Sequence, residues 1–378
     1  MSERGPVAFY APLKSPRDPS PSGDRTMARL LEAALARAGF EPMLASELRT
    51  FDGRGDPRAQ DRLKAESEAA AARLIASLEA LPRALRPRLW FTYHVYYKAP
   101  DWIGPRVAGA LSIPYVIAEG SRAAKRAGGP WALGHRGAEA ALDRADTVFV
   151  MTAQDRPSLE ASRPPGQSLV ELPPFIDEAW TERPAPSRAA PGPEGPTLLA
   201  VAMMRPGDKL ASYRLLAAAL RDIADRPWSL RVVGDGDARE EIERLFAPVA
   251  ERVSFHGTIG DPAILRALYD SAHLFVWPAV NEAYGMALLE AQARGCPVVA
   301  GAFGGVASVV RDGETGCLTA PGDPQAFAAA VRRLISDRPT LERVGAAARR
   351  FVAAERTVNH AAERLRDALL SLLEGARR

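Results

Sequence analysis

Two glutamates of the chain, Glu282 and Glu290, stand on either side of a glycine. Gly285 allows the backbone to turn tightly and to approach a ligand without a side chain in the way. Residues 286–293 are strong helix formers, so we predict a helix that begins beside this glycine. The free N–H groups of a helix start suit a phosphate, and carboxylates accept hydrogen bonds from paired hydroxyls. The spacing predicts a site for a phosphorylated, hydroxyl-rich ligand, with two solvated surface charges as the alternative.

Two cations, Arg205 and Lys209, follow the first strand predicted in the second half of the chain. In α/β folds, ligands bind beyond the C-terminal ends of the strands. Positive charge there can clamp a diphosphate and stabilise it as a leaving group. We therefore predict that both cations bind a diphosphate, with a pair of solvated loop cations as the alternative.

The elements that position these residues alternate between strand and helix, which predicts an α/β fold with two doubly wound parallel sheets. Asp24 is the predicted N-cap of the first helix. In the first half, strands are expected at 7–13, 41–44, 89–94, 115–118 and 147–151, with helices at 26–38, 58–81 and 137–144. In the second half, strands are expected at 197–203, 229–233, 253–256 and 272–277, with helices at 211–222, 239–247, 262–271 and 286–293.

The 378 residues are too many for one ordinary core and suit two domains. A stretch dense in Pro, Ala, Gly and Ser, residues 183–196, predicts a linker. We expect a first domain at 1–182, a second at 197–355, and a C-terminal segment, 356–378, that contains the last helix.

Composition excludes several classes of protein. The formal net charge is +3 and no block of like charge dominates, which argues against a nucleic-acid partner. The two cysteines lie beside buried-strand runs and are typical of core residues in a reducing compartment. No apolar run approaches the ~20 residues of a membrane span, and the N-terminus lacks the pattern of a signal peptide. We expect a cytoplasmic protein.

Metal-ligand spacing is absent, and the five histidines form no cluster, so we predict neither a metal nor a cofactor. A D-x-D sequence, Asp235 to Asp237, follows a predicted strand. The flanking glycines indicate a structural turn, with a metal site on donor phosphates as the disfavoured alternative.

Further candidate residues lie in the first half of the chain. His94 ends a predicted strand among aromatic residues, and it is either a site residue or a satisfied core histidine. Glu119 follows the next strand, where a carboxylate could accept a hydroxyl proton. Gly23 allows close backbone approach, or simply starts a helix. The stretch around Trp131 mixes cations and glycine, and it could touch a membrane surface or a long acceptor.

The order of motifs after Glu282 resembles the C-terminal domain of retaining glycosyltransferases of the GT-B fold, specifically glycosyltransferase family 4. That family often has a glycine where Ala283 stands and commonly a glutamate where Ser308 stands. The motifs that carry the resemblance are E-x7-E at 282–290, a small-residue strand at 297–300, Gly304-Gly305, the turn at 311–316, and Pro321-Gly322-Asp323.

The resemblance implies two Rossmann-like domains that face across a cleft, with the last helix crossing back to the first domain. It implies retaining, metal-independent transfer of a sugar from a nucleotide-sugar to an acceptor hydroxyl. Glu290 would hold ribose hydroxyls and Glu282 sugar hydroxyls, while Arg205 and Lys209 would neutralise the diphosphate and His94 would lie close to the transferred sugar. The other donor-binding residues implied are Tyr284, Gly285, Met286, Ala287 and Gly23.

Three other interpretations remain open at this point. A nucleotide-sugar epimerase or a phosphorylase can use the same fold, and an inactive sugar-binding homologue can keep the same motifs. A dinucleotide dehydrogenase is disfavoured, because no G-x-G-x-x-G follows the first strand of either half. Peripheral contact with the inner membrane surface also stays open.

Overall fold

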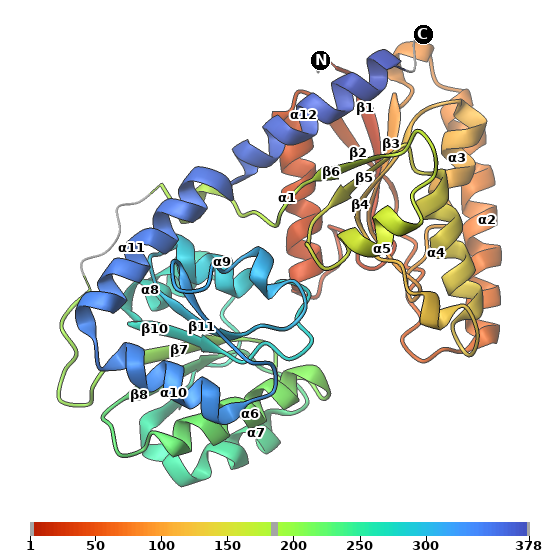
Figure 1. Ribbon diagram of the computed structural model, residues 1–378. Coiled ribbons are helices and arrows are strands. Elements are labelled where there is room, and N and C mark those ends of the chain that lie inside the picture. Colours follow the sequence, from red (N-terminus) through yellow and green to blue (C-terminus); the bar gives the residue numbers. More distant parts are fainter. Residues whose placement is uncertain (1–3, 183–187, 376–378) are drawn as a thin grey trace. The chain divides into compact units, whose positions relative to one another are not determined.

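The computed structural model describes residues 4–182 and 188–375, so residues 183–187 of the predicted linker lie outside the described part. The chain divides into two units (Figure 1). Unit 1 comprises Met1–Pro173 and Val358–Arg378, and unit 2 comprises Pro174–Thr357. The last helix therefore belongs to the unit that contains the N-terminus.

Unit 1 is built on a six-stranded sheet in the order β2-β1-β3-β4-β5-β6, with every neighbouring pair parallel. β3 and β4 are buried along almost their whole length, as expected for a sheet that is covered on both faces. The strands are β1 (Pro6–Tyr10), β2 (Glu41–Ser46), β3 (Leu89–Val95), β4 (Tyr115–Gly120), β5 (Thr147–Val150) and β6 (Ser168–Glu171).

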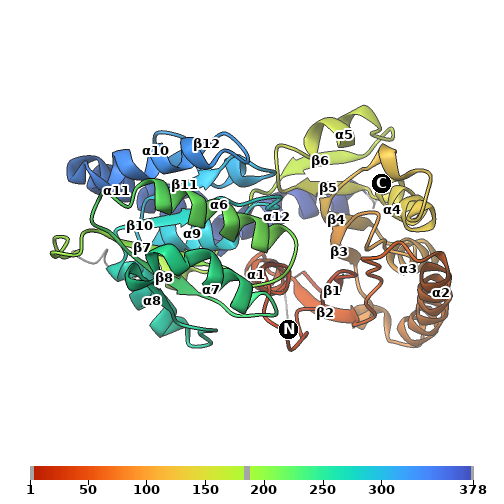
Figure 2. The same cartoon turned by 90° about the horizontal axis from the view of Figure 1, so that it is seen from below.

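Helices cover both faces of this sheet, as Figure 2 shows for α1 on one side and α2, α3 and α4 on the other. α1 packs along α12 on its face, while α2 contacts both α3 and α4. The helices of unit 1 are α1 (Gly23–Arg37), α2 (Pro57–Glu79), α3 (Gly104–Leu111), α4 (Ala132–Arg144), α5 (Arg156–Ala161) and α12 (Val358–Gly375), with the 3-10 turns Arg83–Leu85 and Ala124–Arg126.

Unit 2 repeats the design with a second parallel sheet in the order β12-β11-β10-β7-β8-β9. Its strands are β7 (Thr197–Val201), β8 (Ser229–Val233), β9 (Val253–Phe255), β10 (Leu274–Trp277), β11 (Val298–Gly301) and β12 (Gly316–Thr319). Its helices are α6 (Asp208–Asp222), α7 (Arg239–Phe246), α8 (Pro262–Ser271), α9 (Met286–Ala293), α10 (Pro324–Ile335) and α11 (Arg338–Glu355), with 3-10 turns at Glu178–Trp180, Ala247–Arg252 and Val306–Ser308.

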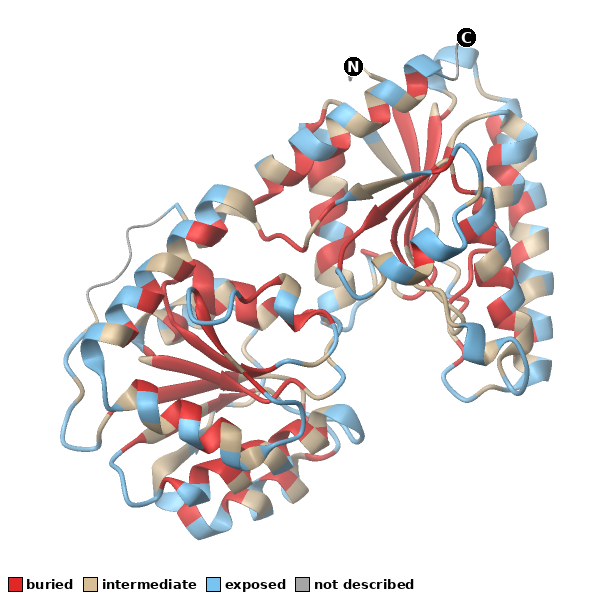
Figure 3. Ribbon diagram, viewed as in Figure 1, coloured by how far each residue is buried: buried red, intermediate tan, exposed pale blue. Residues whose placement is uncertain are grey.

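In unit 2, α8 and α9 lie on one face of the sheet, and α6, α7 and α10 lie on the other (Figure 1). The strands of both sheets form the buried interior of their units (Figure 3). The predicted fold class, α/β with two doubly wound parallel sheets, is confirmed. Within the part of the chain that the structure describes, no helix is long and apolar enough to cross a membrane.

Several local predictions were wrong, and two of them bear on the candidate sites. Ser22, and not Asp24, caps α1: its side chain accepts a hydrogen bond from the backbone N–H of Arg25. The first helix predicted in the second half, α6, begins at Asp208, three residues before the predicted start, because Gly207 with φ +85° turns the chain into it. Lys209 therefore lies in the first turn of a helix instead of in a loop.

The C-terminal end of α9 is held by a buried arginine. Arg294 is 2% exposed, and its guanidinium donates to both carboxylate oxygens of Asp270 on α8, at 2.6 and 2.9 Å. A third hydrogen bond, of 3.0 Å, reaches the carbonyl oxygen of Trp180. Arg294 therefore joins two helices and the segment that enters unit 2.

We expect Arg294→Met to lower the free energy of unfolding by about 2–3 kcal/mol, because it leaves Asp270 without its charge partner. Arg338→Met is the matched control, since Arg338 is exposed and, among the described residues, pairs only with Glu342 on the same helix. That pair should contribute no more than about 0.5 kcal/mol. Urea unfolding followed by tryptophan fluorescence measures both. Equal effects of the two substitutions would contradict this role of Arg294.

Candidate functional site

The loops that follow the strands of unit 2 meet at the carboxyl edge of its sheet. A Cβ on Gly234, after β8, would lie 1.9 Å from the carbonyl oxygen of Ala202, after β7. The backbone N–H of Gly305, after β11, donates to the carbonyl oxygen of Ala283, after β10, at 2.7 Å. This edge is where ligands bind in doubly wound folds.

The loop between β10 and α9 is tied to the start of α6. The ammonium group of Lys209 donates to Oε2 of Glu282 at 2.5 Å, and Asn281 donates to Asp208 at 3.0 Å. The indole N–H of Trp277, at the end of β10, donates to the same oxygen of Glu282 at 3.2 Å. The structure thus brings together Lys209 and Glu282, which lie far apart in the sequence.

The same loop stores backbone strain. Ala279 and Asn281 have φ values of +57° and +48°, in the left-handed region that such residues rarely adopt. Gly285, with φ +80°, is the N-cap residue of α9, and among the described residues no side-chain cap is found on the first N–H groups of this helix. Strain of this kind costs of order 1–3 kcal/mol per residue and clusters at ligand sites. The uncapped helix start suits an anion.

Glu290 is the fifth residue of α9, the helix that follows this loop. Tyr269, at the end of α8, is fully buried, and its hydroxyl donates to Oε2 of Glu290 at 2.8 Å. Burial raises the pKa of Glu290, and the hydrogen bond from Tyr269 opposes that rise. Burial and the charge of Glu290 raise the pKa of Tyr269 well above its ordinary value, so the phenol remains a donor. Tyr269 therefore orients the carboxylate and leaves its second oxygen for a ligand.

The other predicted donor residues of unit 2 lie around the start of α9. Tyr284 and Met286 are buried, and Ala287 is half-buried. Arg205 is exposed in the loop before α6, one turn from Lys209 in sequence. The predicted residues of unit 2 thus share one edge of one sheet, whereas Gly23 is the first residue of α1 in unit 1.

The D-x-D sequence is held by protein groups. Asp235 accepts a hydrogen bond from the guanidinium of Arg239 at 2.9 Å and from the backbone N–H of Gly236 at 2.8 Å. Its carbonyl oxygen accepts from the backbone N–H of Met204. Among the described residues, no group of three or more His, Cys, Asp or Glu side chains could hold a metal ion.

In unit 1, three charged residues gather at the carboxyl ends of β3 and β4. Nδ1 of His94 lies 3.1 Å from a carboxylate oxygen of Asp24 on α1, and Nε2 lies 3.8 Å from Glu119. Both His94 and Glu119 are in the left-handed region, with φ values of +63° and +62°. Two strained residues side by side on adjacent strands mark this as a second candidate site.

The charge of His94 follows from its neighbours. Burial alone would lower the pKa of His94, but the charge of Glu119 and the hydrogen bond and charge of Asp24 outweigh it and raise the pKa from 6.5 to about 9. Burial opposes ionisation of Asp24 too, and its hydrogen bond with His94 nevertheless holds its pKa below the usual value. Burial raises the pKa of Glu119. The raised pKa of His94 favours its cationic form at neutral pH, in which both ring nitrogens carry a proton.

Sequence reasoning missed three members of these sites. Tyr269 and Trp277 were treated only as parts of a helix and a strand, and Asp24 was taken for a helix cap. The partners of Tyr269 and Asp24, Glu290 and His94, lie 21 and 70 positions away in the chain. Only the position of Trp277 at the carboxyl end of a predicted strand could have indicated a site.

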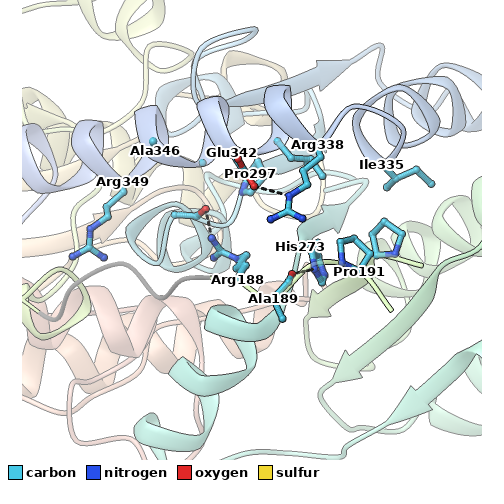
Figure 4. A pocket seen from close by; sticks show the side chains of 14 residues that line it. Arg188, Ala189, Pro191, His273, Pro297, Ile335, Arg338, Glu342, Ala346 and Arg349 are labelled. Atoms are coloured by element: carbon cyan, nitrogen blue, oxygen red, sulfur yellow. Dashed lines mark hydrogen bonds and ion pairs between the residues drawn. The ribbon is translucent and has the colours of Figure 1, made fainter. Parts of the chain in front are cut away.

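A separate cavity of about 400 Å³ lies in unit 2, at the amino ends of the strands. His273 and Pro297 line it and precede β10 and β11, and Arg338 and Glu342 of α11 form another wall (Figure 4). Arg188 reaches the carbonyl oxygens that end α8 and α9, among them that of Gly295 at 2.8 Å. This cavity lies at the opposite end of the strands from Glu282.

The comparison with known families agrees with the geometry of unit 2. Residues 195–337 match the family described as Glycosyl transferases group 1. These residues contain Lys209, Glu282 and Glu290 together with the strands that position them. The predicted resemblance to group 1 glycosyltransferases is confirmed over these residues.

Relatives of this group 1 domain include glycosyltransferases from plants and bacteria. A D-inositol 3-phosphate glycosyltransferase of Geodermatophilus obscurus is 34% identical over 244 residues, which are 59% of this chain and 53% of the relative. The sulfoquinovosyl transferase SQD2 of Arabidopsis thaliana is 36% identical over 135 residues, 34% of this chain and 26% of the relative. The chain thus spans about half or less of these two relatives.

Solved structures share the fold over almost the whole chain. A sucrose-phosphate synthase from Thermosynechococcus elongatus superposes with a TM-score of 0.70 at 21% identity, covering 98% of this chain and 100% of that one. Anabaena HepE, in complex with UDP and glucose, has a TM-score of 0.70 at 16% identity and covers 97% and 99%. At these identities, the similarity establishes the fold.

The charge on His94 gives a prediction for unit 1. In NMR titrations with labelled histidine, His94 should lose its proton near pH 9, and Asp24→Asn should move this midpoint towards 6.5. Because the pKa is raised on folding, protonated His94 stabilises the protein fully below pH 6.5, and this contribution is lost as pH rises through 9. His256, in unit 2, is the internal control. A His94 midpoint near 6.5 in the unsubstituted protein would show that the carboxylates do not act on it.

Proposed function

We propose that the protein transfers a sugar from a nucleotide-sugar donor to a hydroxyl group of an acceptor. The observation that carries this proposal is the Lys209–Glu282 pair beside the uncapped start of α9, within the group 1 domain. The cation and the helix start can bind the diphosphate of such a donor. The carboxylates can bind its sugar and its ribose.

The ribose end of the donor is assigned to Glu290. A carboxylate accepts hydrogen bonds from two adjacent hydroxyls, which matches the 2′ and 3′ hydroxyls of a ribose. Tyr269 already occupies one carboxylate oxygen and holds the side chain in position. The buried surroundings of Glu290 strengthen each hydrogen bond that its charge makes.

The diphosphate is assigned to the start of α9 and to the cations of the preceding loops. A diphosphate that approached the backbone of residues 284–287 would compete with Glu282 for the ammonium group of Lys209. Once released, Glu282 could accept hydrogen bonds from sugar hydroxyls. Donor binding would thus exchange an internal ion pair for two ligand contacts.

The chemistry proposed is retaining and independent of metal. Positive charge from Arg205 and Lys209 would stabilise the diphosphate as it departs, the task that a divalent cation has in other sites. Attack on the same face of the sugar would let the leaving phosphate take the acceptor proton. Unit 1 would present the acceptor, with cationic His94 as a hydrogen-bond donor to a sugar or acceptor oxygen.

Proteins similar to this chain support the choice of donor. Structures of Anabaena HepE contain UDP or UDP-glucose, and the bacterial relative is a D-inositol 3-phosphate glycosyltransferase. By analogy, we propose a uridine, guanosine or adenosine diphosphate sugar as donor and a glycan, lipid or small molecule as acceptor. A cytoplasmic location with peripheral membrane contact is compatible with a lipid acceptor.

Nucleotide binding tests the proposal directly. Calorimetry with UDP, GDP and ADP, without added metal, should give micromolar affinity for one of them. Glu290→Ala should weaken it at least about tenfold, because a hydrogen bond to a charged group contributes about 1.5–3 kcal/mol. Glu251→Ala is the matched control, because it removes an exposed carboxylate elsewhere in unit 2. If none of the three nucleotides binds the folded protein, the proposed function is wrong.

Turnover measurements test whether Lys209 acts in the reaction or only in donor binding. The donor is the nucleotide-sugar chosen by calorimetry, and the nucleotide that the reaction liberates is measured. Lys209→Met should lower kcat about 10²–10³-fold and weaken donor binding far less. Lys209→Arg, which keeps the charge, should recover part of the rate. A uniform loss of binding and rate in both variants would indicate a structural role. Product analysis without an acceptor distinguishes an epimerase, and phosphate-dependent turnover a phosphorylase, while binding without turnover indicates an inactive homologue.

A further inference from the structure

Two cations of unit 1 lie over the same two aromatic rings. The ammonium group of Lys98 is 5.7 Å from the ring centre of Tyr97 and 5.5 Å from that of Trp131. The guanidinium carbon of Arg126 is 5.2 Å and 5.0 Å from the same two centres. The rings themselves meet edge to face, with centroids 5.8 Å apart. These four residues are called the aromatic–cation cluster below.

The cluster is held in place by hydrogen bonds among three loops. Trp131 donates its indole N–H to the carbonyl oxygen of Asp52 at 3.0 Å. Gln60, buried on α2, donates to the Asp52 carboxylate at 2.7 Å and to the carbonyl oxygen of Pro130 at 2.8 Å. Its own oxygen accepts from the backbone N–H of Gly134. The surface is therefore preformed, and a ligand need not order it.

Within the part of the chain that the structure describes, the positive charges of the cluster have no negative partner. No ion pair involves Lys98 or Arg126 within the described residues, and Nε of Arg126 is buried without a hydrogen bond there. The carboxylate of Asp52 is engaged by the backbone N–H groups of its own loop and by Gln60. Arg122 differs, because Glu139 and Asp143 neutralise it.

Two unpaired like charges above shared rings repel each other, and an anion between them would turn this repulsion into attraction. Arginine offers a planar fork of donors, and lysine adds a compact charge. The aromatic rings offer apolar surface for the uncharged part of the same molecule. The chemistry that fits is a phosphate ester on a small polar body.

The cluster also lies at the ligand-binding edge of its sheet. Tyr97 and Lys98 form the tip of a tight turn, closed by Tyr96 and Ala99, directly after β3. His94, at the end of β3, precedes them by three residues and stacks near the ring of Tyr96, with ring centres 5.0 Å apart. The cluster and the Asp24–His94–Glu119 group therefore share one edge.

We propose that Lys98 and Arg126 bind the phosphate group of a phosphorylated acceptor, with Tyr97 and Trp131 supporting its uncharged part. This rests on the proposed function, in which unit 1 receives the acceptor. The phosphate belongs to a soluble phosphate ester or to a lipid headgroup. Both sources present the same group to the cluster.

Direct binding tests the inference. Calorimetry at low ionic strength compares glycerol 3-phosphate with glycerol, and vesicle sedimentation compares phosphatidic acid in phosphatidylcholine with phosphatidylcholine alone. We expect the protein to bind at least one phosphate probe and neither neutral one. The double variant Lys98→Gln, Arg126→Gln should weaken this binding at least about tenfold, as expected for charge-assisted hydrogen bonds. The arm that binds identifies the source of the phosphate.

Lys125→Gln is the matched control, because Lys125 is exposed in the same turn but lies over neither ring. It should leave phosphate binding unchanged. Nucleotide affinity, measured on every variant, reports on folding and on the separate site in unit 2. If nucleotide binds but neither phosphate probe does, or if the double variant binds phosphate as the unsubstituted protein does, the inference is wrong while the proposed function stands.

Discussion

The candidate site of unit 2 depends on the ion pair between Lys209 and Glu282. Both side chains are partly buried, with 25% and 18% of their surface exposed, so their charges are less screened than those of a surface pair. The pair joins the first turn of α6 to the strained loop before α9, and Trp277 supports the same carboxylate oxygen. Without a ligand, each charge satisfies the other, and a diphosphate would replace one of them.

Unit 1 uses charge differently. The imidazole of His94 lies between two carboxylates on adjacent elements, and the backbone at His94 and Glu119 is held in an unfavourable conformation. At the same edge, Lys98 and Arg126 have no carboxylate partner among the described residues. One edge of one sheet thus carries a neutralised cation and two uncompensated ones. This contrast is what favours an anionic ligand at the aromatic–cation cluster and a hydrogen-bonding role for His94.

Local patterns predicted much of this fold, because strand and helix signals in a doubly wound protein are short and strong. The bounds of α8 and α9 agree with the prediction residue for residue, since a proline and a glycine begin them. Asp24 shows where local reasoning fails: Ser22 is an equally good cap, and the partner of Asp24 is 70 residues away. Tyr269 and Glu290 meet only because α8 and α9 pack on the same face of the sheet.

The proposed function requires the donor to lie at the carboxyl edge of unit 2, and hydrogen–deuterium exchange locates it most directly. Exchange would be measured on the full chain alone and with UDP, GDP and ADP in turn. We expect one nucleotide to slow exchange in residues 279–290 and 204–210, the loops joined by Lys209 and Glu282. Protection confined to the cavity around His273 and Arg338, or absent with all three nucleotides, would contradict this placement of the donor.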